Sequence, residues 1–62
     1  MINALKIKSI MVEKGFTQKS FAKELGMTRQ NFAILLKKGD TTISNLEKIA
    51  KILDVELQIL LK

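Results

Sequence analysis

The sequence predicts an all-α protein, a single domain over residues 1–62 that folds as a compact bundle of five short helices. Apolar residues recur at intervals of three and four along most of the chain, which is the spacing of helical faces. Proline is absent, and no alternating apolar–polar stretch or hairpin dipeptide predicts a strand. With 47% apolar and 27% charged residues, the composition is typical of a folded domain.

The first two helices are predicted from their spacing and their ends. The first is expected over residues 3–14 and stops before Gly15, because glycine tolerates the left-handed backbone that follows many helices. Its inward residues are Ala4, Ile7, Ile10 and Met11. Thr17 is a suitable N-cap for a second helix that ends at Gly26. The inward residues of this helix are Phe21, Ala22 and Leu25.

Three further helices follow. Thr28 is expected to cap the third by accepting a hydrogen bond from the amide of Asn31, and Gly39 ends it. Its inward residues are Phe32, Leu35 and Leu36. Thr42 caps the fourth, whose inward residues are Ile43, Leu46, Ile49, Ala50 and Leu53. After Asp54, a last short helix carries Leu57, Leu60 and Leu61. Helices this short are marginal in isolation, so packing must stabilise them.

The net charge of +5 is concentrated in one part of the chain. Residues 1–38 carry eight lysines and arginines against two glutamates, whereas residues 39–62 carry three lysines against four acidic residues. A basic half favours a polyanionic partner such as nucleic acid. The alternative is that the lysines only keep a small apolar protein soluble.

Several function classes are disfavoured by residue types that the chain lacks. Without cysteine or histidine, neither a disulfide framework nor an ordinary Cys/His metal site is available. No general base or nucleophile of those types exists, and the six carboxylates are spread over predicted exposed faces, so we expect no enzymatic activity, cofactor or small-molecule ligand. No apolar run approaches the length of a membrane span, and we expect no membrane association.

The corner between the second and third helices carries the strongest motif. Only Gly26 and Met27 separate the two predicted helices, and so short a turn sets helices at a steep angle. The pattern Q-x-x-x-A-x-x-x-G-x-x-x-x-x-F-x-x-L, from Gln18 to Leu35, resembles the helix-turn-helix of the phage-repressor-like (Cro/Xre, lambda-repressor-like) DNA-binding family. The motif spans about residues 17–36. The flanking strings EKGFTQ and TISNLEKIAKILDVELQILL are similar to the family's first-helix end and last two helices.

The resemblance implies sequence-specific binding of double-stranded DNA by a small transcriptional repressor, with the third helix in the major groove. The implied base contacts are Thr28, Arg29, Gln30, Ala33 and Ile34. The implied phosphate contacts are Gln18, Lys19, Asn31, Lys37 and Lys38, together with amides of the 39–42 loop. Arginine suits the two acceptors of guanine and glutamine suits adenine. The family resemblance also places the protein in the cytoplasm, encoded by a prokaryotic cell or a phage.

These residues have ordinary explanations as well. Arg29 and Gln30 suit any exposed first turn, and Lys37 and Lys38 suit the negative end of a helix dipole. Ile34 is compatible with thymine-methyl contact, with a protein interface or with a relaxed surface position. An alternative function is therefore a protein-interaction module of the same fold, an antitoxin or anti-repressor anchored by exposed apolar residues, namely Ile34, Leu5 and Val12.

Two positions depart from the family. Many members pair an arginine late in the first helix with a glutamate near the end of the third, and by register Met11 and Leu36 stand there. Because both charges are replaced together, we expect a packed apolar contact between these helices.

The first and last helices hold more apolar residues than one core face needs. Leu5 and Val12, with Ile2 nearby, point away from the core face of the first helix, and Ile59 points away from that of the last. Either the two chain ends pack against each other, or these residues form a self-complementary patch for a homodimer. A two-fold dimer would set two recognition helices about 34 Å apart on a palindromic site. The family resemblance favours the dimer.

Overall fold

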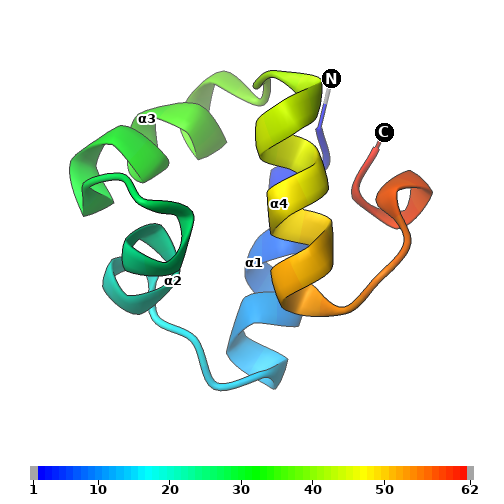
Figure 1. Ribbon diagram of the computed structural model, residues 1–62, viewed down its shortest axis with the longest axis horizontal. Helices are drawn as coiled ribbons and strands as arrows, with labels where there is room; N and C mark the ends of the chain where they lie inside the picture. Colours follow the sequence, from blue (N-terminus) through cyan, green and yellow to red (C-terminus); the bar gives the residue numbers. More distant parts are fainter. Residues whose placement is uncertain (1, 62) are drawn as a thin grey trace.

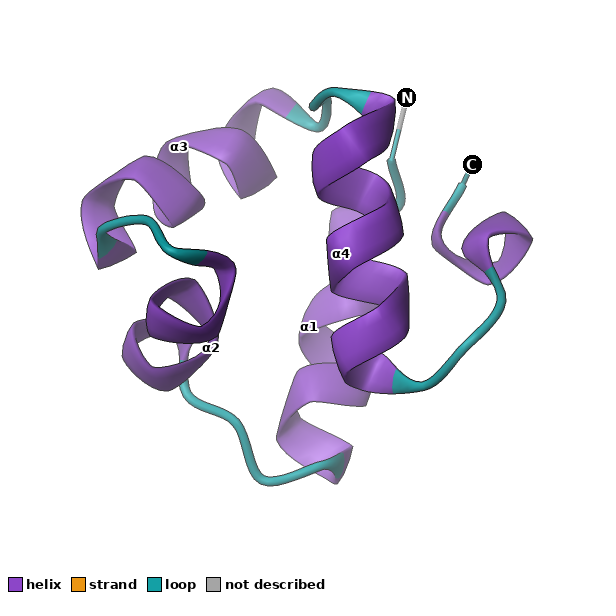
Figure 2. Cartoon of the chain, viewed as in Figure 1, coloured by secondary structure: helices purple, strands orange, loops and turns teal. Residues whose placement is uncertain are grey.

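The computed structural model describes residues 2–61, which form four α-helices and a final 3-10 helix. In chain order these elements are α1 (Ala4–Glu13), α2 (Gln18–Leu25), α3 (Arg29–Lys38), α4 (Ile43–Leu53) and η1 (Leu57–Leu60). Figure 1 shows α2 and α3 on one side of α4 and η1 on the other. The helices account for most of the described chain and are joined by short loops (Figure 2). The prediction of an all-α fold is confirmed.

The predicted bundle of five helices is not confirmed, because the last element is a single 3-10 turn of four residues. Asp54 ends α4 in the left-handed conformation, with φ 57°, and Leu61 is already extended. This extended residue forms an isolated antiparallel bridge with Ile2. The end of the described chain therefore lies beside its beginning.

Local capping determines where the α-helices begin. The hydroxyls of Thr17, Thr28 and Thr42 each accept a hydrogen bond from the amide three residues on, at 3.1, 3.1 and 3.2 Å. Asn3 caps α1 in the same way through its side-chain oxygen, 3.1 Å from the amide of Lys6. All three predicted threonine caps are thus confirmed. Each hydroxyl satisfies one of the amides that a helix start leaves without an intrahelical partner.

One apolar core lies between the elements. It consists of Ile2, Ile7, Met11, Phe21, Ala22, Leu25, Phe32, Leu35, Leu36, Leu46, Ile49, Ala50, Leu53 and Leu60. The predicted inward faces of α2 and α3 are confirmed in full, and Ala4, Ile10 and Leu57 are partly buried against the core. No polar or charged side chain is buried among the described residues. Met11 and Leu36 both lie in this core, with 2% and 5% exposure.

Two residues that were expected to point inward are exposed. Ile43 is 63% exposed because it is the first residue of α4 and lies about 70° around the helix from the centre of the buried stripe. Leu61 is 39% exposed because it belongs to the extended end and not to a helix. The inward stripe of α4 therefore begins one turn later than predicted, at Leu46.

The two chain ends pack against each other. The amide of Ile2 donates to the carbonyl of Gly39 at 2.9 Å, and the amide of Asn3 donates to that of Leu60 at 2.7 Å. Ile2 is 1% exposed, so it belongs to the core and not to an outward patch. The packing of the two chain ends therefore explains the apolar side chain at Ile2. It does not cover Leu5, Val12 and Ile59, which are exposed.

Candidate DNA-binding surface

The corner between α2 and α3 is held by short-range contacts. Gly26 ends α2 in the left-handed conformation with φ 77°, which glycine adopts without the steric cost of a Cβ. The amide of Met27 then donates to the carbonyl of Ala22 at 3.0 Å, and Thr28 is extended before α3 begins. The Ala22 side chain is fully buried. These contacts set the direction in which α3 leaves α2.

Three aromatic rings hold the two helices together beneath this corner. The ring centroids of Phe21 and Phe32 are 5.4 Å apart, which joins the inward faces of α2 and α3 directly. Phe16, in the loop before α2, meets Phe21 edge-on at 5.1 Å. Because both Phe21 and Phe32 are fully buried, α3 is anchored along its inward side.

The opposite side of α3 is exposed throughout. It carries Arg29, Gln30, Asn31, Ala33, Ile34, Lys37 and Lys38. With the exposed cap Thr28, this surface includes all five predicted base contacts. Arg29, Lys37 and Lys38 form no ion pair within residues 2–61 (N···O distance up to 4.0 Å), so their charges face solvent without a neutralising partner. The exposed side of α3 therefore forms a ridge that is mostly polar and basic.

The predicted phosphate contacts lie at the ends of α2 and α3. Gln18 is the first residue of α2 and is half-buried, and Lys19 beside it is exposed. The amides of a first helical turn point out of the helix and favour an anion. Asn31 uses its backbone amide for the Thr28 cap, but its side chain is exposed. Lys37 and Lys38 form the exposed last turn of α3.

The amides of the 39–42 loop were expected to contact phosphate, but two of them already donate hydrogen bonds within the protein. The amide of Gly39 donates to the Leu35 carbonyl at 3.1 Å, and that of Thr41 donates to the Asp40 carboxylate at 2.9 Å. The Asn45 side chain also donates to the Thr41 hydroxyl at 3.3 Å. These two amides are therefore not available as phosphate donors, and Asp40 adds a negative charge there.

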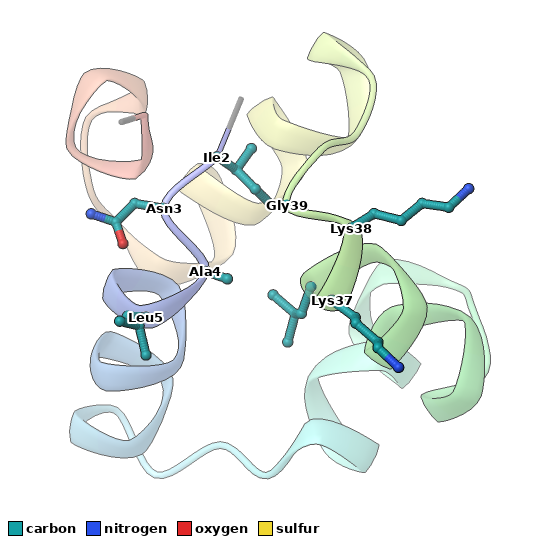
Figure 3. A pocket seen from close by; sticks show the side chains of 8 residues that line it. Ile2, Asn3, Ala4, Leu5, Lys37, Lys38 and Gly39 are labelled. Carbon is teal, nitrogen blue, oxygen red and sulfur yellow. The ribbon is translucent and has the colours of Figure 1, made fainter.

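A shallow groove of about 280 Å³ lies beside the end of α3. It is lined by Ile2, Asn3, Ala4, Leu5, Leu36, Lys37, Lys38 and Gly39 (Figure 3). Figure 3 shows the groove between the start of α1 and the last turn of α3, with the Lys38 side chain extending away from α1. No local pattern predicts this groove, because its two walls lie more than thirty residues apart in sequence.

The expected dimer residues are all exposed. Leu5 and Val12 are 79% and 75% exposed, seven residues apart on α1, and Ile59 on η1 is 44% exposed. Since the amide of Asn3 donates to the carbonyl of Leu60, η1 lies against the start of α1. Separations of seven residues place side chains on one face of a helix.

Membrane-spanning and metal-binding features were also sought. Within residues 2–61, every helix is too short or too polar to span a bilayer. In the same residues, acidic side chains do not gather in a group of three or more that could hold a metal ion.

Comparison with known proteins identifies the family. A family model for the Cro/C1-type HTH DNA-binding domain matches residues 6–62, which is all but the first five residues of the chain. No curated protein and no solved structure gives a significant match. The matched region includes the Thr17 and Thr28 caps, the Gly26 corner and the exposed ridge of α3. The chain therefore belongs to the Cro/C1-type helix-turn-helix family of DNA-binding domains.

Proposed function

We propose that this DNA-binding domain acts as a transcriptional repressor, which binds a palindromic operator as a homodimer and places α3 in the major groove. The observation that carries the proposal is the division of α3 into two sides. Phe32, Leu35 and Leu36 anchor one side in the core, while the other is exposed and basic. A helix held in this way matches the width of the major groove, whose edges identify each base pair.

The base contacts are assigned to the start and middle of α3. N-terminal residues of a recognition helix meet base edges, and Arg29 and Gln30 form the first turn of α3. Arg29 suits guanine, which offers two acceptors, and Gln30 suits adenine, which offers a donor and an acceptor. The exposed Thr28, Ala33 and Ile34 complete the set of base contacts.

Phosphate contacts are assigned to residues at the borders of this ridge. Gln18 and Lys19 stand at the start of α2, and Lys37 and Lys38 at the end of α3, with Asn31 between them. Contacts of this kind orient the protein and release counterions, so affinity falls with rising salt. Such a protein represses transcription by occupying a promoter and so excluding polymerase. Its place of action is the cytoplasm of a prokaryotic cell or of a phage host.

Selection from a random duplex library tests the groove assignment. The expected result is a palindrome with half-sites about one helical turn apart.

On that operator, Arg29→Ala should cost about 1–3 kcal/mol of binding free energy and relax the preference at one base pair. Lys38→Ala should weaken binding to all sequences alike and lower the salt slope by about one. Lys48→Ala, on α4, is the matched control and should change neither quantity. Unchanged affinity in both Arg29→Ala and Lys38→Ala would refute the assignment.

The homodimer is assigned to a surface on α1 and η1. The exposed apolar residues Leu5, Val12 and Ile59 support a self-complementary patch, since burial of such side chains on association is favourable. Leu5→Glu and Val12→Glu should shift the mass measured by light scattering from dimer to monomer without changing the fold. Ile43→Glu is the control, because Ile43 is 63% exposed but lies on α4. A wild-type protein that is monomeric on its operator would contradict the assignment.

The second candidate function is a protein-interaction module, an antitoxin or anti-repressor. The exposed apolar residues Leu5, Val12 and Ile34 are the observation that favours it. A folded protein that enriches no duplex at moderate salt would support this function and reject the repressor.

A further inference from the structure

We infer that Ile34 reads the 5-methyl group of a thymine in each half-site of the operator. This inference rests on the proposed function, in which α3 lies in the major groove. It concerns Ile34 because this is the one large apolar side chain on the exposed side of α3.

The position of Ile34 on α3 is the first argument. The three buried residues of α3 define the inward direction, and at about 100° per residue the opposite direction falls between Gln30 and Ile34. Gln30, Ile34 and Lys37 lie within about 35° of that outward line, whereas Ala33 and Arg29 lie toward one edge. Ile34 is therefore on the crest of the ridge, where a helix comes nearest to the base pairs.

The exposure of Ile34 is the second argument. Its side chain is 49% exposed, while Leu35 and Leu36, the next two residues, are 9% and 5% exposed. Its neighbours one helical turn away, at separations of three and four residues, are all polar, namely Gln30, Asn31, Lys37 and Lys38. The exposed half of its apolar surface is therefore available to a partner.

The chemistry of the isoleucine side chain indicates which base it contacts. An isoleucine side chain neither donates nor accepts a hydrogen bond, so it cannot satisfy the amino group of cytosine or adenine or the acceptors of guanine. Covering one of those groups would leave it desolvated without a partner, which is costly. The thymine methyl is the only apolar group in the major groove. Gln30 lies four residues before Ile34 and suits adenine, so the two together favour an A·T-containing step.

The test removes the methyl group and nothing else. In the selected operator, each thymine of a half-site is replaced in turn by deoxyuridine, and binding is measured for the wild type and for Ile34→Ala. When the contacted thymine of a half-site is replaced, the affinity of the wild type should fall about four-fold. This fold-change corresponds to the burial of one methyl group. Ile34→Ala should bind more weakly to the thymine operator but show no loss on this replacement. Arg29→Ala is the matched control, because it should keep the four-fold sensitivity.

The outcomes separate the inference from the function on which it rests. A wild type that binds its operator but tolerates deoxyuridine at every position overturns the inference and leaves the repressor intact. Equal sensitivity in Ile34→Ala and wild type also overturns it, because another residue would then contact the methyl. Failure to select any operator from folded protein overturns both.

Discussion

A carboxylate placed at position 36 should unfold the protein. The Leu36 side chain is 5% exposed within a core that contains no polar or charged group among the described residues. Leu36→Glu therefore places a carboxylate among core side chains that are all apolar. Uncompensated burial of a charge costs about 3–5 kcal/mol, and the lost burial of leucine adds about 1.5–3 kcal/mol.

This cost is comparable to the whole stability of the domain. At 0.05–0.15 kcal/mol per residue, a chain of this length is stable by about 3–9 kcal/mol. Urea denaturation followed by circular dichroism at 222 nm should thus find Leu36→Glu largely unfolded in water. Ile34→Glu is the control on the same helix, and because Ile34 is half exposed it should lose only about 0.5–1 kcal/mol.

A double variant tests the contact that is expected between α1 and α3. Met11→Arg combined with Leu36→Glu places an arginine and a glutamate where many family members have their ion pair. The double variant should be more stable than Leu36→Glu alone, because a paired buried charge costs far less than an unpaired one. A Leu36→Glu protein that unfolds at the wild-type urea concentration would show that the register of α3 is wrong. A double variant no more stable than the single one would show that positions 11 and 36 do not meet.

Three smaller perturbations test the ends of the helices. Gly26→Ala should cost about 1–2 kcal/mol through backbone strain, because beyond its two chain neighbours no residue has an atom within 4 Å of the added Cβ; thermal unfolding measures this loss. Thr17→Ala should cost about 1 kcal/mol in the same assay, since it removes the hydroxyl that accepts from the Ser20 amide and donates to the Ser20 hydroxyl. Asp54→Gly should be neutral or raise stability by up to about 1 kcal/mol, whereas Asp54→Val should lower it by about 1–2 kcal/mol, because φ is 57° there. A destabilised Asp54→Gly would contradict that explanation.

The sequence alone determined the features that depend on neighbours within one or two helical turns. The threonine caps and the glycine ends follow from hydrogen bonds and dihedral angles across three or four residues, and each predicted threonine cap is present. The inward faces of α2 and α3 follow from the helical period, and so does the exposure of Arg29, Gln30 and Ile34. The spacing of Gly26 and its partners was also enough to indicate the family.

Only the tertiary structure decided the features that depend on segments far apart in sequence. Ile2 is buried where the two chain ends meet, since its amide donates to Gly39 and it forms a bridge with Leu61, and the last element there is a single 3-10 turn. Ile43 fits the spacing of three and four residues, but it is the first residue of α4 and lies beyond the edge of the stripe that the rest of the protein covers. Periodicity determines which side of a helix is apolar, but burial requires a second surface, and the position of that surface is a property of the whole chain.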